Sequence, residues 1–406
     1  MKKILIVILI GLAGMANADV WTQLNNGPRH INIGCSFTIG NKGYIGGGRD
    51  TLVNLTKSFW EYDPSIDAWT QKADIPGVSR LCPAGFSIGN MGYVGLGNDS
   101  TSFTLLNDFW QYDNVSNTWL QKANFPGQYP WQTTSFSLGN YGFVCTGTGY
   151  SGNGNGTDLW EYDPISDTWS QKTSFPGMPR SSASSFTIGD NVYVGGGRSL
   201  ATSTCFNDFW RYNLNTLSWI QIAVFTGIPT ALAASFSIGD KGYYGIGEDS
   251  LFYNHNEFWQ YDTTLNQWNQ KMSFSGLTRS AAIFFSVGTK GYIGMGSSGN
   301  YPDYIDFWEY DPNGNAGIES IPPNILTIAI SPNPFQDKSL LTIQGCTTNA
   351  TLNIYNIEGK VVYRMTGISG INKQLTITDE QLSNGIYFYQ LMDANETLAT
   401  GKIVRE

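Results

Sequence analysis

The chain has 406 residues, of which 41% are apolar and only 14% are charged, and it contains 47 glycines. An ordinary soluble domain has about 25% charged residues and about 7% glycine, so this composition excludes a disordered chain, a coiled coil and a collagen-like chain. The 32 acidic and 23 basic residues give a net charge of -9. Because no basic cluster occurs, no nucleic-acid partner is expected. With only two histidines, the sequence predicts no metal or other cofactor.

Residues 1–18 have the pattern of a signal peptide. Two lysines precede the aliphatic run from Ile4 to Leu12, and Ala16-Asn17-Ala18 supplies the small residues that signal peptidase requires at its cut. We therefore expect an exported chain whose mature form begins at Asp19. A membrane anchor is the alternative, but the run is about half of the 20 or so apolar residues that a spanning helix needs. No transmembrane helix is expected.

Five cysteines, an odd number, are scattered along the chain. Most are expected to be small buried apolar residues. Cys35 and Cys82 are the one pair close in register in two neighbouring repeats. The sequence alone does not decide whether a disulfide joins them.

Tryptophans reveal an internal repeat of about 50 residues. One series, each within a version of Phe-Trp-x-Tyr-Asp, recurs every 49 or 50 residues at Trp60, Trp110, Trp160, Trp210, Trp259 and Trp308. A second series follows nine residues behind at Trp69, Trp119, Trp169, Trp219 and Trp268. Each repeat also has two earlier segments, Phe-x-Ile-Gly and Gly-Tyr-x-Gly-x-Gly. All four segments are short, aromatic or β-branched and bounded by turn residues, so we expect four strands per repeat, called a, b, c and d in chain order.

Six units of four short strands predict an all-β fold, a six-bladed β-propeller. The sixth unit lacks a strand d, because Gly317 stands nine residues after Trp308. Trp21, within 20–24, has the strand-d pattern with no strand c before it. We therefore expect residues 20–24 to pair with residues 307–311 and close the ring. Closure removes the exposed edge that an open array would carry.

The repeat resembles that of kelch propellers, over residues 20–312, which implies a propeller domain at 19–312. The residues that carry the resemblance are the glycines ending strand b, such as Gly46-Gly47-Gly48 and Gly195-Gly196-Gly197, then Tyr62 and its equivalents, and the strand-d tryptophans. The double glycine is lost most clearly at Cys145-Thr146-Gly147, where the match to the family is weaker.

The repeat stops after Asp311, and residues 313–324 have the Gly, Asn and Pro content of a linker. Residues 325–406 are expected to form a small β-sandwich of about seven short strands. Their sequence is similar to the type A sorting domain of the type IX secretion system of Bacteroidetes. The matching residues are Ser331-Pro332-Asn333-Pro334-Phe335, the run from Leu352 to Val362, the run from Leu382 to Phe388, and Gly401-Lys402-Ile403-Val404. The resemblance implies the secretion machinery as a partner and a secreted or outer-membrane surface location. A plain β-sandwich binding module is the alternative.

Strand order predicts where a site lies. Consecutive antiparallel strands reverse direction, so the d-to-a and b-to-c loops emerge at one end of the ring. These loops vary between units, whereas the a-to-b and c-to-d turns at the other end are uniform. A rigid scaffold positions function on variable loops, so we expect binding at the first end, which we call the loop face.

Several loop residues are candidates for ligand contact. Trp131, beside Tyr129, is the tryptophan that the repeat does not explain, and an exposed Trp stacks on sugars or anchors proteins. The alternative is a Trp tucked against its own blade. His255, a lone loop histidine, is a further candidate. Arginines stand six residues before the strand-a phenylalanine in alternate units, at Arg80, Arg180 and Arg279.

Because strand a lines the channel of a propeller, these arginines are expected to face its mouth and grip an anion. The alternative is pairing with an acid of a neighbouring blade, such as Asp99 or Glu248. An acid also precedes most c strands, and we expect it to hold the strand entrance through loop amides. These acids are Asp108, Asp158, Asp208, Glu257 and Asp306, with Ser58 in the first unit.

Two functions are open at this point. The first is a secreted or cell-surface propeller that binds a glycan or protein partner without chemistry of its own. The second follows from the family resemblance, because some kelch propellers are copper oxidases of sugars or sialic acid mutarotases. A galactose oxidase-like activity asks for a Tyr-Cys cross-link and two histidines at one metal, which this pattern disfavours. A mutarotase-like activity asks for one of the three arginines with an acid such as Glu248.

Overall fold

The computed structural model describes residues 19–406 except 51, 53, 100–101, 103, 150–154, 300–302, 315–326, 332, 379–381 and 394–395. The predicted signal peptide and most of the predicted linker lie outside these residues. The chain divides into two compact units, Met1–Ala316 and Gly317–Glu406. Each unit is described by itself.

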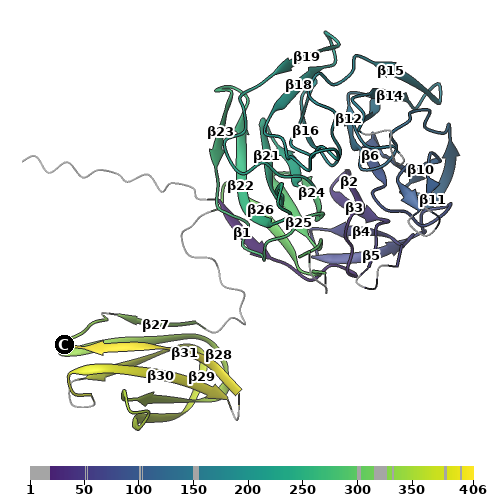
Figure 1. The fold of residues 1–406 in the computed structure, drawn as a ribbon. Helices are drawn as coiled ribbons and strands as arrows, with labels where there is room; N and C mark the ends of the chain where they lie inside the picture. The colour runs from purple at the N-terminus through teal and green to yellow at the C-terminus, as the bar shows by residue number, and fades with distance from the viewer. Residues whose placement is uncertain are drawn as a thin grey trace, which may run out of the picture. The chain divides into compact units, whose positions relative to one another are not determined.

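The first unit is a ring of six antiparallel four-stranded sheets, seen end-on in Figure 1. Blade 1 holds β2 (Cys35–Ile39), β3 (Lys42–Gly46), β4 (Phe59–Asp63) and β5 (Ala68–Lys72). Blade 2 holds β6 (Ala84–Ile88), β7 (Met91–Gly95), β10 (Phe109–Asp113) and β11 (Thr118–Lys122), with the small pair β8 (Asn98–Asp99) and β9 (Thr104–Leu105) in its loop. Blade 3 holds β12 (Thr134–Leu138), β13 (Tyr141–Cys145), β14 (Leu159–Asp163) and β15 (Thr168–Lys172).

The other three blades follow the same order. Blade 4 holds β16 (Ser184–Ile188), β17 (Asn191–Gly195), β18 (Phe209–Asn213) and β19 (Ser218–Gln221). Blade 5 holds β20 (Ala234–Ile238), β21 (Lys241–Glu248), β22 (Asn254–Asp262) and β23 (Gln267–Gln270). Blade 6 holds β24 (Ile283–Val287), β25 (Lys290–Gly294) and β26 (Phe307–Asp311), and its fourth strand is β1 (Val20–Gln23).

The ring closes as the sequence predicts. β1 pairs antiparallel with β26, from Val20 opposite Asp311 to Gln23 opposite Trp308. Trp21 is 5% exposed and packs against aromatic rings of blades 5 and 6. The first and last strands of the propeller therefore share one sheet.

Neighbouring blades interlock through a phenylalanine on strand a. Phe37 of blade 1 lies over Gly92 in β7 of blade 2, where an added Cβ would stand 2.6 Å from the ring. Phe86 lies in the same way over Gly142 of blade 3. A larger residue at these glycines would displace the ring, so packing between blades favours the Gly in Gly-Tyr-x-Gly. Blade 4 is the exception, because Val192 stands at this position and packs in one cluster with Phe136 of blade 3.

The strand-d tryptophans of blades 2 to 6 link each of these blades to the one before it. Their indole N–H groups donate to backbone carbonyls of the preceding blade: Trp119 to Ala73, Trp169 to Ala123, Trp219 to Thr173, Trp268 to Ala223 and Trp21 to Met272. The donor–acceptor distances lie between 2.9 and 3.1 Å. This explains the second tryptophan series in blades 2 to 6, since a buried indole N–H needs an acceptor. The indole N–H of Trp69 in blade 1 is buried without such a bond.

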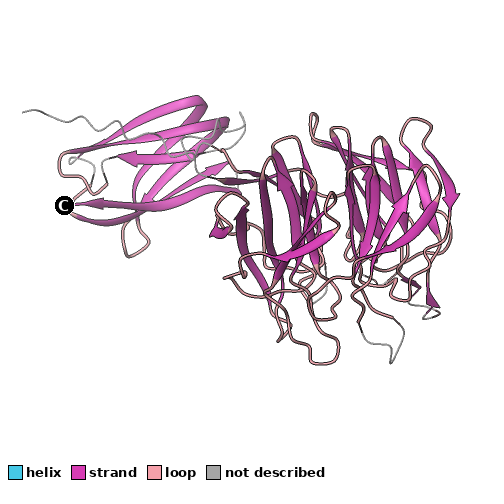
Figure 2. Cartoon of the chain, turned by 90° about the horizontal axis from the view of Figure 1, so that it is seen from above, coloured by secondary structure: helices cyan, strands magenta, loops and turns pink. Residues whose placement is uncertain are grey.

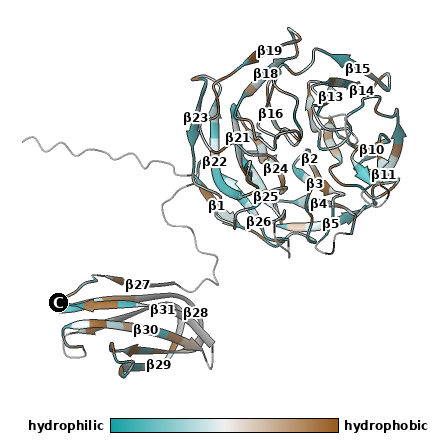
Figure 3. Ribbon diagram, in the orientation of Figure 1, coloured by the Kyte–Doolittle hydropathy of each residue, from teal (hydrophilic) through white to brown (hydrophobic). Residues whose placement is uncertain are grey.

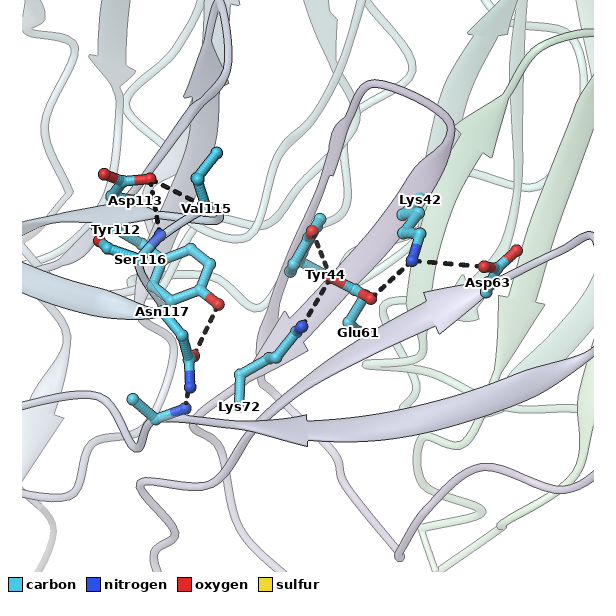
Figure 4. A network of polar contacts seen from close by, with 11 residues as sticks. Lys42, Tyr44, Glu61, Asp63, Lys72, Tyr112, Asp113, Val115, Ser116 and Asn117 are labelled. Carbon is cyan, nitrogen blue, oxygen red and sulfur yellow. Dashed lines mark hydrogen bonds and ion pairs between the residues drawn. The ribbon is translucent and has the colours of Figure 1, made fainter.

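Polar networks hold the uniform end of the ring (Figure 4). Asn117, in the c-to-d turn of blade 2, accepts hydrogen bonds from the Tyr112 hydroxyl and from the backbone N–H of Ala73 in blade 1. Glu61 accepts from Tyr44 and pairs with two lysines of its own blade. Burial alone would raise the pKa of Glu61, but these donors outweigh it and hold the pKa below its usual value. The turns at this end are therefore structural.

Side chains sort by distance from the ring axis. The outermost strands, such as β5 and β15, are drawn mostly in hydrophilic colours in Figure 3 and have only half-buried and exposed positions. The b strands are buried almost throughout, as in β13 and β17. Figure 2 shows the blades from the side, with loops leaving both ends of the strands. The core therefore lies between the blades.

The second unit is also a β-structure. Its described residues form β27 (Thr327–Ser331), β28 (Lys338–Tyr355), β29 (Val361–Thr378), β30 (Gly385–Asp393) and β31 (Glu396–Arg405). The expectation of about seven short strands is corrected here, because β28 and β29 are each 18 residues long and continue through register shifts. Their core contains Leu352, Ile354, Leu391 and Ile403. Within the described residues, no helix is long and apolar enough to cross a membrane.

Candidate functional site

The d-to-a and b-to-c loops lie together at one end of the propeller, as strand order predicts. In every blade, one residue of the d-to-a loop forms a backbone bridge with one residue of the b-to-c loop, for example Ser181 with Arg198 and Ala231 with Glu248. The loop face is thus built from paired loops. These pairs hold the loop residues against the blades.

The centre of the ring holds a cavity of about 170 Å³, lined by residues of all six blades. One lining residue per blade has a left-handed backbone, with φ between 48° and 57°, at Ile33, Cys82, Gln132, Ser182, Leu232 and Ala281. Five of them donate their N–H to the carbonyl of the equivalent residue in the preceding blade, at 2.9–3.2 Å. Backbone hydrogen bonds between five of the six neighbouring pairs of blades therefore surround the cavity.

Hydroxyl groups of strand a complete the wall of this cavity. Ser135 donates to the Gly85 carbonyl at 3.2 Å, and Ser36 donates to the carbonyl of Phe284. Outside the cavity lining, Ser235 repeats the bond, to the Ser185 carbonyl at 2.8 Å. The described lining residues carry no charged side chain. The channel is therefore a small, neutral lumen whose hydroxyls hold neighbouring blades together.

The three arginines of alternate blades lie away from this lumen. Arg80, Arg180 and Arg279 are each at most 1% exposed. Each forms a two-pronged ion pair with the acid that precedes strand c of its own blade, Asp108, Asp208 and Asp306 respectively, at 2.6–2.9 Å. Each also donates to a backbone carbonyl at the end of strand b, as Arg180 does to Gly196 at 3.0 Å.

The expected position of these arginines at the channel mouth was therefore wrong. Their donors are used inside the blade, where the guanidinium links the d-to-a loop, the end of strand b and the start of strand c. The alternative of pairing across blades was also wrong for them, although Arg198 of blade 4 does pair with Glu248 of blade 5 at 2.7 Å. The arginines and the acids, which the sequence presented as two features, form one structural clamp.

The clamp changes the acidity of its carboxylates. Burial alone would raise the pKa of Asp208, but the hydrogen bonds and charge of Arg180 outweigh it and hold the pKa below its usual value. The indole N–H of Trp210 adds a hydrogen bond at 2.8 Å. Asp208 is thus ionised, and both of its carboxylate oxygens accept hydrogen bonds within the blade, which suits a structural role.

The other candidate residues do not form one site. Tyr129 is half-buried and packs against Gly156 beside Asp158 in blade 3, while His255 belongs to blade 5 and bonds to Asp249 at 2.9 Å. Trp131 is half-buried, and its indole N–H is enclosed near the thiol of Cys82. Trp131 is thus enclosed and not an exposed stacking platform, but its indole N–H lies against Cys82 of blade 2 and not against its own blade 3.

Three consecutive exposed apolar residues lie on the loop face at the tip of blade 5. Strands β21 and β22 extend further than their equivalents, with Glu248 opposite Asn254. The turn between them presents Leu251, Phe252 and Tyr253, which are 73%, 59% and 67% exposed. We call these three residues the blade-5 knob.

The knob is held rigidly. The Asp249 carboxylate accepts the backbone N–H groups of Leu251 and Tyr253 at 2.8 and 3.0 Å. From blade 4, Arg198 donates to the Asp249 carbonyl at 2.7 Å and stacks on the Phe252 ring at 4.2 Å. Sequence reasoning marked this loop as variable and missed the knob. The signal was present as three consecutive large apolar residues in a loop otherwise rich in Asp, Asn and Ser.

Comparison with known proteins agrees with this architecture. A family model described as the KLHDC2/KLHL20/DRC7 Kelch-repeats domain matches residues 143–296, and one described as the Secretion system C-terminal sorting domain matches residues 329–406. The chain is a kelch-repeat propeller with a C-terminal type IX secretion sorting domain. A solved structure described as "Structure of YjhT" shares the fold, with a TM-score of 0.58 at 16% identity over 70% of this chain and 96% of that one. No curated protein gives a significant match.

The structure explains why the double glycine at the end of strand b is kept in some blades of this kelch propeller and lost in others. The first of the two positions has a positive φ in all six blades, whether it holds Gly47, Leu96, Thr146, Gly196, Ile246 or Met295. The second is always glycine, because an added Cβ at Gly48 would lie 2.4 Å from the Asn32 carbonyl oxygen. The third blade, where the sequence match is weaker, therefore keeps the same backbone path.

The cysteines of the propeller are unlinked. Cys35, Cys82, Cys145 and Cys205 are all free, so the possible Cys35–Cys82 disulfide does not form in this structure. Burial raises the pKa of Cys35 and of Cys82 to about 12. Because the thiolate is the reactive form, these thiols are expected to be inert.

We expect the native mature chain to show at most one thiol that reacts with Ellman's reagent at pH 8, since the side chain of Cys346 is the one whose surroundings are not described. All five should react in guanidinium chloride. A Cys346→Ser variant is the control and should show none in the native state. Rapid reaction of two or more native thiols would contradict the burial.

Proposed function

We propose that the propeller is a secreted binding module that docks a partner through its loop face, with the blade-5 knob as the main contact. The observation that carries this proposal is the exposure of three consecutive large apolar side chains on a braced hairpin. Large apolar residues clustered on a rigid surface are typical of interaction sites, whereas single exposed ones are ordinary. Export by the sorting domain supports an extracellular partner.

A protein suits the knob better than a glycan. Two of the three knob residues offer convex bulk, and one face of the third, Phe252, is covered by the Arg198 guanidinium. Aromatic platforms for sugars need a free ring face, whereas a convex apolar group fits an apolar pocket of a protein. A glycan at the loop face is kept as an outcome of the test. The half-buried Tyr129 and Trp131 and the Asp249-bound His255 are secondary positions in this proposal.

The test screens the labelled mature chain against a glycan array and an array of extracellular bacterial proteins. A Phe252→Ser/Tyr253→Ser double variant is expected to lose at least tenfold in affinity for the captured ligand, because the contact area of two aromatic anchors is removed. The matched control is Ile165→Ser, which removes a 93% exposed apolar residue in a c-to-d turn at the other end of the ring. Unchanged binding by the knob variant, or loss with Ile165→Ser, would contradict the proposal.

A further inference from the structure

The Arg clamps of blades 4 and 6 show which kind of group can occupy the space beside the acid that precedes strand c. The Arg180 guanidinium carbon lies 4.8 Å from the Phe175 ring centre and 4.2 Å from that of Phe206, with Asp208 at its open side. In blade 6, Arg279 lies between Phe274 at 4.8 Å and Tyr304 at 4.3 Å, paired with Asp306. Both blades therefore contain a cage of one carboxylate and two aromatic rings around a cation.

Blade 5 keeps much of this cage and lacks its cation. Thr230 stands where the other blades have arginine, and its hydroxyl takes over the bond to the strand-b carbonyl, at Ile246 at 3.1 Å. The acid is retained as Glu257, which accepts the Trp259 indole N–H at 3.3 Å and the Ile228 backbone N–H at 3.2 Å. Within the described residues, Glu257 has no ion-pair partner.

A small cavity is left at this place. It has a volume of about 10 Å³ and is lined by Phe225, Thr230, Tyr244, His255, Glu257 and others. Tyr244, which is 1% exposed, fills part of the space by bonding to Thr230 at 2.8 Å. The remaining volume is near the 10–15 Å³ or so that one water molecule requires. The equivalent place in blade 3, beside Asp158, has no such room.

We propose that this cavity in blade 5 is a binding site for a primary ammonium group. An ammonium nitrogen is close to water in size, so it fits where a guanidinium does not. Glu257 supplies the charge, the Thr230 and Tyr244 hydroxyl oxygens supply acceptors, and Phe225, 3% exposed, supplies a ring face as Phe175 does for Arg180. This proposal does not rest on the proposed docking of a protein at the knob.

The test measures the melting temperature of the mature chain at increasing concentrations of methylammonium chloride. Potassium chloride at equal ionic strength is the reference. A ligand that binds the folded state raises the melting temperature with a saturable dependence on concentration. We expect a saturable rise of a few degrees with methylammonium and none with potassium. An equal rise with potassium, or no rise with either salt, would overturn the proposal.

Two variants locate the effect. Glu257→Gln preserves the shape of the side chain and removes its charge, so the methylammonium shift is expected to disappear. Asp158→Asn is the matched control, because it neutralises the corresponding acid of blade 3 beside a place without room, and it should leave the shift unchanged. A shift that survives Glu257→Gln would overturn the assignment. Failure of the knob variant to affect partner binding would leave this result untouched, so the two proposals fail separately.

Discussion

Replacing Arg180 with methionine is expected to lower the free energy of unfolding by about 3–5 kcal/mol. Methionine keeps much of the side-chain volume, so the loss comes from Asp208, which would remain charged and only 21% exposed without its partner. The Gly196 carbonyl would also lose its donor. Urea unfolding of the mature chain at pH 7, followed by tryptophan fluorescence, measures the change.

The pH dependence of this loss has a defined sign. In the wild type the pKa of Asp208 lies below that of an unfolded aspartate, about 3.9, so the ion pair stabilises the fold above that pH and is lost as the pH falls through the folded pKa. In the variant, burial without the guanidinium raises the pKa of Asp208, and protonation then relieves the unpaired charge. The difference in the free energy of unfolding between the wild type and Arg180→Met is therefore expected to become smaller as the pH falls from about 6 to about 3.

Two further variants separate a structural clamp from a ligand site. The double variant Arg180→Met/Asp208→Asn removes both charges and should recover a large part of the lost stability. Lys122→Met breaks a longer and more exposed pair with Asp167, at 3.6 Å and with the carboxylate side chain 39% exposed, and should cost about 1 kcal/mol or less. If Arg180→Met unfolds within about 1 kcal/mol of the wild type, the clamp is not what holds these loops.

The tryptophan spacing was enough to predict the propeller, its six blades and the strand that closes it. The spacing reports contacts that five of the six blades repeat, because the strand-d indoles of blades 2 to 6 donate to a carbonyl of the preceding blade. A repeated contact appears as a repeated residue, and a repeated residue is visible in one sequence. The glycine of strand b is visible for the same reason.

The arginine clamps could not be placed in this way. The sequence shows that Arg180 lies six residues before the strand-a residue Phe186 and Asp208 two before Trp210. It does not show that the Arg180 side chain turns back into its own blade. That direction depends on the loop, where the Met178 carbonyl accepts the Arg180 Nε–H at 2.9 Å. The knob was hidden for a related reason, since its exposure depends on how far β21 and β22 extend beyond the ring.

Removing the first strand is expected to have the second large effect. Trp21 makes ring contacts of 4.8–5.0 Å with Tyr310, Phe258 and Phe274, which are at most 1% exposed in the closed ring. Truncating a buried tryptophan costs about 3–5 kcal/mol, so Trp21→Ala should lower the melting temperature by roughly 6–20 °C. A chain that begins at Asn25 should lose more, because β26 also loses its ladder partner.

A peptide added in trans distinguishes closure of the ring from the loss of one packed side chain. If β1 acts by completing the sheet of blade 6, a synthetic peptide of residues 19–27 should restore the melting temperature of the chain that begins at Asn25. The same peptide with Trp21→Ala should restore much less, because the indole and its bond to the Met272 carbonyl anchor the strand. Asp19 is part of this anchor, since its carboxylate accepts the Met272 N–H at 2.7 Å and the Tyr310 hydroxyl at 3.0 Å. If the truncated chain, without added peptide, melts at the temperature of the wild type, blade 6 is stable with three strands and the ring does not need β1 to close it.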